Sequence, residues 1–212
     1  MNFVLGLDLD GVCADFYGRM REIVAELNEV PIDSLPGQVS FGLAEWGVDG
    51  IEEYRRIHRF AVTQRKLFDS MKPIPGAVPA LRRLSNEGIH IRIITHRLFI
   101  PHFHQIAVTQ TTTWLDRHGF LYHDLCFMKD KDLVDADLYV EDAEQNILRL
   151  QEQGKPVITF TNSTNVHTAA KRRAGSWQDA EAMIRETYYE YRSRSNLPLP
   201  TGPGKEPPSG SA

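Results

Sequence analysis

Residues 3–16 read FVLGLDLDGVCADF, an apolar run that ends in two aspartates and a glycine. The short apolar run at 3–9, bounded by charge and a turn residue, predicts a buried strand. Asp8 and Asp10 stand two residues apart, so the two-residue period of a strand points both side chains to the same face at its carboxyl end. Gly11 then lets the chain turn sharply. The stretch predicts one strand of a buried sheet with two carboxylates at its end.

The rest of the chain alternates strand and helix patterns. Further apolar runs indicate buried strands at 89–95, 138–140 and 156–161, with a weaker one at 124–128. Helical patterns lie between them at 77–87, 103–118 and 143–153, and each is followed by the glycine that often ends a helix. This alternation predicts an α/β fold, a three-layer α/β/α Rossmann-like core with a parallel sheet. Ligands of such folds gather at the carboxyl ends of the strands.

Residues 15–72 interrupt the alternation. The segment is too long for a plain crossover and carries two stripes of apolar residues at helical spacing. These stripes are Phe16, Met20, Ile23, Val24 and Leu27, then Ile51, Tyr54, Ile57 and Ala61. We therefore predict a small inserted helical cap at 15–72 on a core domain formed by 1–14 and 73–193. Its aromatic residues could close over a ligand, although core packing is the favoured interpretation for any one of them.

Composition excludes several classes of function. The formal charge is −4, from 28 acidic and 24 basic residues, so no basic stripe favours long nucleic acid as a partner. No apolar run approaches the roughly 20 residues of a membrane span, and aspartates interrupt the first run too early for a secretory signal. Cys13 and Cys126 lie in or beside apolar segments, where free thiols are expected. We expect a cytoplasmic protein without a membrane partner, and a homodimer stays open. Residues 194–212, rich in Pro, Gly and Ser, predict a disordered tail.

Two acidic pairs each stand at the end of a predicted strand. Asp8 and Asp10 repel each other unless a cation or a proton lies between them, and Mg²⁺ is the natural partner of such oxygens. Glu141 and Asp142 end the strand at 138–140 in the same way. Because parallel strands end at one edge of a sheet, the two pairs can share a metal ion. Asp142 could also cap the helix that follows.

Residues that could bind phosphate follow the other strands. Thr95 ends the strand at 89–95, where its hydroxyl and the next backbone N–H groups could hold a phosphoryl oxygen. Lys129 and Lys131 would usually be a solvated charge run, but their spacing before Glu141 favours a lysine that neutralises carboxylates and binds phosphate.

A polar cluster follows Thr95. It comprises His96, Arg97, His102 and His104, and the spacing of its histidines is no recognised zinc pattern, so we disfavour zinc. Neither a P-loop nor a G-x-G-x-x-G motif occurs, which argues against the nucleotide-cofactor folds that use those cradles.

The order of these motifs resembles the haloacid dehalogenase superfamily. More narrowly, DLDGVCADFYG and the later MKPIPGA are similar to the 5′(3′)-deoxyribonucleotidases, over roughly residues 3–160. The resemblance implies a Mg²⁺-dependent phosphomonoesterase that forms an aspartyl-phosphate on Asp8, with Asp10 as general acid and base. It implies that Asp8, the backbone carbonyl of Asp10 and Asp142 coordinate Mg²⁺. It also implies that Thr95 binds the phosphate and that Lys131 stabilises it.

Fewer residues in the sequence indicate which substrate is bound. In the resemblance Phe16 matches an aromatic residue that lines the base pocket, whereas His96 and Arg97 stand where a small residue is usual and bear on the phosphate pocket. Glu141 stands where an aspartate is more usual. The expected substrate is a nucleoside monophosphate, with deoxyribonucleotides favoured. The alternatives are another small phosphomonoester, such as a sugar phosphate, and a catalytically idle binding protein.

Overall fold

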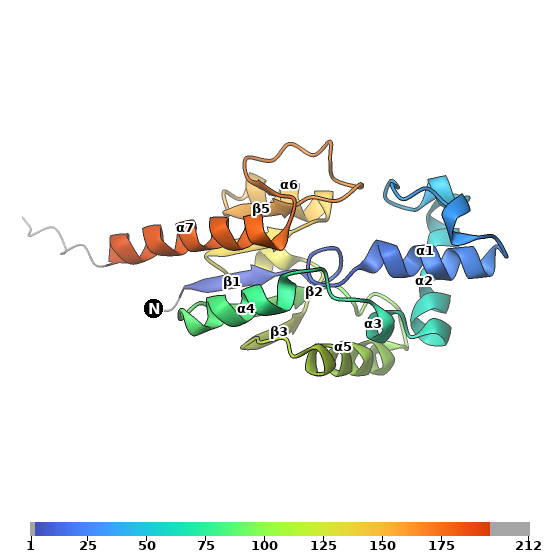
Figure 1. The fold of residues 1–212 in the computed structure, drawn as a ribbon, viewed down its shortest axis with the longest axis horizontal. Helices are drawn as coiled ribbons and strands as arrows, with labels where there is room; N and C mark the ends of the chain where they lie inside the picture. The colour runs from blue at the N-terminus through green and yellow to red at the C-terminus, as the bar shows by residue number, and fades with distance from the viewer. Residues whose placement is uncertain (1–2, 196–212) are drawn as a thin grey trace, which may run out of the picture.

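The computed structural model describes residues 3–195, which form a six-stranded parallel sheet (Figure 1). Its strands are β1 Val4–Leu7, β2 His90–Thr95, β3 Asp124–Phe127, β4 Leu138–Glu141, β5 Val157–Phe160 and β6 Arg173–Ala174. Their order across the sheet is β3-β2-β1-β4-β5-β6. The five predicted strands are confirmed. Strand β6 was not predicted, because two residues with an arginine form no apolar run.

The strand order reverses at β1, which places this strand at the centre of the sheet. Leu7 pairs with Ile93 of β2 on one side and with Val140 of β4 on the other. The residues that follow these three strands therefore lie together at one edge. In doubly wound sheets, the reversal point is where ligands bind.

Helices cover both faces of the sheet, as predicted. They are α4 Ala77–Asn86, α5 His104–His118, α6 Glu144–Glu152 and α7 Trp177–Ser195. On one face, α4, α5 and α7 share a large apolar core with inward residues such as Leu7 and Val140. On the other, Ile147 of α6 packs with Ile94 and Tyr139. This is the expected three-layer α/β/α core.

Between β1 and α4 the chain is helical and stands beyond the carboxyl end of β1 (Figure 1). The elements are α1 Phe16–Leu27, η1 Ile32–Ser34, η2 Ala44–Trp46, α2 Gly50–Arg65 and α3 Leu67–Ser70. Asp15 caps α1 by accepting a hydrogen bond from the Gly18 N–H at 2.9 Å. Most residues of the two predicted stripes are buried, although Leu27 and Ile51 are exposed. We call residues 16–70 the helical lobe; its status as a separate cap at 15–72 stays a prediction.

The predicted start of the tail needs one correction. Helix α7 runs to Ser195, so residues 194–195 are helical, because the first helix-breaking proline comes only at Pro198 and Arg194 pairs with Glu190 one turn earlier. The rest of the predicted tail lies outside the described residues. Cys13 and Cys126 are free, as expected. No helix within residues 3–195 is long and apolar enough to span a membrane.

Candidate active site

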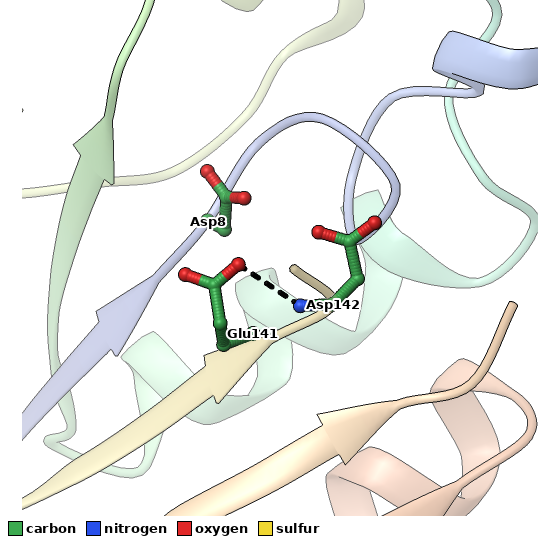
Figure 2. A group of neighbouring side chains, drawn as sticks. All are labelled: Asp8, Glu141 and Asp142. Carbon is green, nitrogen blue, oxygen red and sulfur yellow. Dashed lines mark hydrogen bonds between the residues drawn. The ribbon is translucent and has the colours of Figure 1, made fainter. Parts of the chain in front are cut away.

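Three buried carboxylates meet where β1 and β4 end (Figure 2). Oxygen atoms of Asp8, Glu141 and Asp142 all lie within 4.8 Å of one another. The arrangement follows from the sheet, since the Asp8 N–H still donates to the Val140 carbonyl at 3.1 Å and continues the pairing of β1 with β4. Within residues 3–195 this is the only group of three or more Asp, Glu, His or Cys side chains that could hold a metal ion.

Lys131 provides a positive charge within this acidic group. It begins the 3-10 turn η3 Lys131–Leu133, and its Nζ lies 2.7 Å from Asp8 Oδ1 and 2.7 Å from Glu141 Oε2. The side chain is buried, whereas Lys129 is exposed. The structure therefore brings Lys131, the lysine favoured from the sequence, to the carboxylates, and Lys129 stays in solvent.

The ionisation of the group reflects an excess of negative charge. Burial, with repulsion from Glu141, raises the pKa of Asp8 to about 8. Burial, with repulsion from Asp8, likewise raises the pKa of Asp142 well above its usual value. Burial opposes the charge of Lys131, but attraction to Asp8 and Glu141 outweighs it and raises the pKa of the ammonium. One lysine therefore leaves three buried carboxylates incompletely neutralised.

These residues fit a divalent cation. All donors in the group are carboxylate oxygens, which hard cations such as Mg²⁺ prefer, and a bound cation would relieve the repulsion that raises both aspartate pKa values. Asn162 orients Asp142 by donating from Nδ2 to Oδ2 at 2.6 Å. Asn162 was not among the predicted site residues, although its position directly after the predicted strand at 156–161 marks it as a candidate.

The loop after β1 approaches Asp142 closely. Gly11 has φ +78°, and a Cβ at this position would lie 1.9 Å from Asp142 Oδ2. Only glycine accommodates both the backbone conformation and the contact. The predicted metal ligands Asp8 and Asp142, and the loop that carries the Asp10 carbonyl, therefore lie at one edge.

Glu141 has a supporting position in the group. Its Oε1 accepts the backbone N–H groups of Asp142 and Ala143, both at 3.0 Å, and its Oε2 pairs with Lys131. The carboxylate thus orients both the lysine and the turn that carries Asp142. The resemblance had assigned this residue no role, and only the three-dimensional contacts assign one.

Thr95 lies at the end of β2, next to β1. Its side chain is buried, and its hydroxyl has no hydrogen-bond partner among the described residues. A buried, unpaired hydroxyl costs on the order of 1–3 kcal/mol, so a ligand oxygen would satisfy it. His96 is exposed and packs near Phe99, with ring centroids 5.7 Å apart. Partial desolvation of the ring, aided by the Lys129 charge, lowers the pKa of His96.

Arg97 contacts a different partner from the predicted one. Its Nη2 and Nε donate to Asp10 Oδ1 and Oδ2 at 2.6 and 3.1 Å, and its Nη1 donates to the Thr111 hydroxyl at 3.1 Å. The side chain is 1% exposed. The Asp10 carboxylate therefore stands apart from the three-carboxylate group and is bound by Arg97, so direct contact of Arg97 with a substrate phosphate stays a prediction that this geometry disfavours.

Phe16, the predicted base-pocket residue, is the first residue of α1 and is buried. It stacks on His58 of α2, with ring centroids 5.7 Å apart and planes 24° apart. The His58 ring also meets Phe99 edge-on at 4.5 Å, and its Nδ1 has no hydrogen-bond partner among the described residues. His58 was not among the predicted site residues, because a single histidine in an apolar helical stripe has the pattern of a core residue.

Comparison with known proteins identifies the family. Residues 2–189 match the family model described as 5′ nucleotidase, deoxy (pyrimidine), cytosolic type C protein (NT5C). The chain belongs to this family. It is therefore a phosphoric monoester hydrolase, as the sequence predicted, and the idle binding protein is disfavoured.

Individual relatives agree with this assignment. A Chlorobaculum tepidum protein named "Putative 5′(3′)-deoxyribonucleotidase" is 58% identical over 184 residues, which cover 87% of this chain and 91% of the relative. The Mus musculus protein named 5′(3′)-deoxyribonucleotidase, mitochondrial, is 25% identical over 82% of this chain and 80% of its own.

Solved structures agree on the fold. The haloacid dehalogenase-like family hydrolase SP0104 from Streptococcus pneumoniae has a TM-score of 0.58 at 14% identity, over 86% of this chain and 98% of its own. A predicted phosphatase from Clostridium acetobutylicum has a TM-score of 0.57 at 13% identity, over 88% and 99%. The predicted haloacid dehalogenase fold is confirmed.

Proposed function

We propose that this enzyme hydrolyses deoxyribonucleoside monophosphates with Mg²⁺, through an aspartyl-phosphate on Asp8. The observation that carries the proposal is the state of the Asp8 carboxylate. Its Oδ1 accepts the Leu9 N–H at 2.8 Å and pairs with Lys131, whereas no hydrogen bond or ion pair reaches Oδ2 within residues 3–195. One oxygen is held, and the other is available to attack phosphorus.

Charge is the main obstacle to this attack. A carboxylate and a phosphate oxygen repel by about 4 kcal/mol per pair of unit charges at ~4 Å with an effective dielectric near ~20. Lys131 offsets this repulsion from its position beside Asp8. Mg²⁺, held by Asp8, Asp142 and the backbone carbonyl of Asp10, would neutralise phosphoryl oxygens when bound. The unpaired Thr95 hydroxyl is suited to hold one such oxygen.

The reaction then runs in two steps. Asp8 Oδ2 forms a bond to phosphorus while the bond from phosphorus to the nucleoside oxygen breaks, and Asp10 gives its proton to that leaving oxygen. Next, a water oxygen attacks phosphorus while Asp10 takes a proton from the water. The bond from phosphorus to Asp8 breaks, inorganic phosphate leaves, and Asp8 and Asp10 return to their starting states. Positioning and charge stabilisation supply most of the rate.

Two lines of support favour a nucleotide over another small phosphomonoester. The family model is described as a nucleotidase, and the relative that is 58% identical to this chain carries the name "Putative 5′(3′)-deoxyribonucleotidase". Phe16 and His58 of the helical lobe also stack on each other, and the His58 ring meets Phe99 of the loop after β2. The half-buried Phe99 is the part of this aromatic cluster that a base could contact. The cytoplasmic location and the homodimer stay predictions.

A substrate panel tests the proposal. Phosphate release is measured from deoxyribonucleoside, ribonucleoside and sugar monophosphates with Mg²⁺, with EDTA and the Asp8→Asn variant as controls. We expect the deoxyribonucleotides to be hydrolysed fastest, and both controls to abolish turnover. Preference for sugar phosphates would contradict the nucleotide assignment alone, whereas turnover by Asp8→Asn would contradict the covalent mechanism.

A further inference from the structure

Arg97 is one of the largest fully buried side chains of the protein, and it is charged. A buried guanidinium is costly unless its donors are paired. Here each of its three nitrogens donates a hydrogen bond, two of them to the two oxygens of Asp10 and the third to Thr111. The bidentate contact fixes both the position and the rotation of the Asp10 carboxylate.

Two neighbours hold Arg97 itself. The Thr111 hydroxyl accepts from Nη1 and in turn donates to the Ala107 carbonyl within α5, at 2.7 Å. The guanidinium carbon also lies 4.5 Å from the centroid of the Phe68 ring of α3, a cation–π contact. Arg97 therefore connects Asp10 to α5 of the core and to α3 of the helical lobe, which pack on each other.

This arrangement suits a positioning residue better than a phosphate ligand. The Arg97 side chain is 1% exposed and its nitrogens already donate hydrogen bonds, whereas the Asp10 side chain is 26% exposed. Asp10 is thus the member of the pair that can reach a substrate. A phosphate that bound Arg97 directly would have to break its contacts with Asp10.

We propose that Arg97 is a positioning residue for Asp10, the acid–base group. Arg97 is held by Phe68 of α3 and Thr111 of α5, and it fixes the Asp10 carboxylate in turn. This inference rests on the proposed function, because it takes Asp10 as the group that exchanges protons with the leaving oxygen and with water. Arg97 would then support the proton-transfer steps and would not bind the substrate phosphate.

The conservative variant Arg97→Lys tests the inference, because lysine keeps the charge but cannot bind both carboxylate oxygens in parallel. With the preferred nucleotide, we expect kcat to fall about 10- to 100-fold, less than the full ~100- to 10,000-fold that acid–base catalysis contributes because Asp10 itself is retained, while KM changes less than about threefold. In the Asp10→Asn background, the same substitution should change kcat by less than about threefold, because the group that it positions is already lost. The milder Thr111→Val variant should lower kcat in the same direction by a smaller factor.

Three results would overturn the inference. A rise of about tenfold in KM and in the inhibition constant for inorganic phosphate, with kcat unchanged, would make Arg97 a phosphate ligand. Equal losses of kcat in the wild-type and Asp10→Asn backgrounds would assign it a general structural role. If Arg97→Lys melts far below the wild type, an unchanged kcat in Thr111→Val would count against the inference. Absence of turnover by the wild-type enzyme would instead refute the proposed function itself.

Discussion

At the level of single residues, the candidate active site holds more buried negative charge than positive charge. Three carboxylates are buried around one ammonium, and the pKa of Asp8 is raised to about 8 by burial and by Glu141. A divalent cation would neutralise the two negative charges that remain. Because Lys131 Nζ lies 2.7 Å from Asp8 Oδ1, the ammonium and the Asp8 carboxylate neutralise each other directly.

Removal of the Lys131 ammonium should therefore affect both activity and stability. In Lys131→Met, Asp8 and Glu141 lose the charge that each meets at 2.7 Å. We expect kcat/KM to fall at least about 100-fold, and the free energy of unfolding to fall by about 3 kcal/mol, the usual cost of removing one partner from a buried ion pair. Steady-state kinetics and denaturant unfolding measure the two effects. The exposed Lys129→Met is the matched control, and equal behaviour of the two variants would refute the role.

The contact between Gly11 and Asp142 gives a second prediction. In Gly11→Ala the new methyl group would lie 1.9 Å from Asp142 Oδ2, so Asp142 or the loop must move. Because misplacement of catalytic groups by about 1 Å can cost ~100-fold, we expect a loss of that order in kcat/KM. Gly37→Ala is the control, since nothing lies within 4 Å of a Cβ at that position. Wild-type kinetics in Gly11→Ala would show that this close approach is not required.

At the scale of elements, packing of α1 against α2 buries a histidine among aromatic rings. Burial lowers the pKa of His58 to about 4, from 6.5. The unfolded chain therefore binds a proton at this residue as the pH falls below about 6.5, while the folded chain binds it only near about 4. Between pH 6.5 and about 4 the unfolded state therefore binds more protons than the folded state. The stability that neutral His58 contributes is fully present above pH 6.5 and is lost as the pH falls toward 4.

Denaturant unfolding between pH 7 and pH 4 tests this contribution. The wild type should lose about 3 kcal/mol of unfolding free energy relative to His58→Phe across the window, because each unit of pKa difference is worth about 1.4 kcal/mol. The same replacement at exposed His167 serves as the control. Parallel pH profiles for the wild type and His58→Phe would contradict a buried, neutral His58.

Contacts that follow from strand pairing can be predicted from the sequence, whereas contacts that depend on how helices and loops pack cannot. The strand ends that carry Asp8 and Asp142 are predictable, because apolar runs locate the strands and parallel pairing brings their ends together. The pairing of Arg97 with Asp10 is not, because it depends on how α3 and α5 pack against the loop after β2. The unpaired Nδ1 of His58 cannot be predicted from periodicity either, because periodicity indicates only that the residue lies in an apolar stripe.

At the scale of the whole molecule, the sheet and the helical lobe place every proposed catalytic group at the strand-reversal edge. A cation that binds this edge binds the folded chain in preference to the unfolded one, so it should stabilise the entire fold. Because β1 and β4 are the two central strands of the sheet, the three buried carboxylates repel one another at the centre of the fold.

Thermal unfolding with and without Mg²⁺ measures this coupling. At about 100 times its dissociation constant, Mg²⁺ should add about 2.7 kcal/mol of stability and raise Tm by several degrees. Asp142→Asn should largely remove the Mg²⁺-dependent rise, whereas Asp33→Asn, on the exposed surface of the helical lobe, should keep it. A rise of equal size in all three proteins would place the cation elsewhere.

An aspartyl-phosphate on Asp8 can be trapped directly. The enzyme is quenched with acid during turnover of a deoxyribonucleoside monophosphate in Mg²⁺, and its peptides are examined by mass spectrometry. We predict one phosphoryl group on Asp8, in the peptide FVLGLDLDGVCADF, which hydroxylamine removes and which is absent from Asp8→Asn. Full turnover by Asp8→Asn, or a phosphoryl group found on another residue, would rule out Asp8 as the nucleophile.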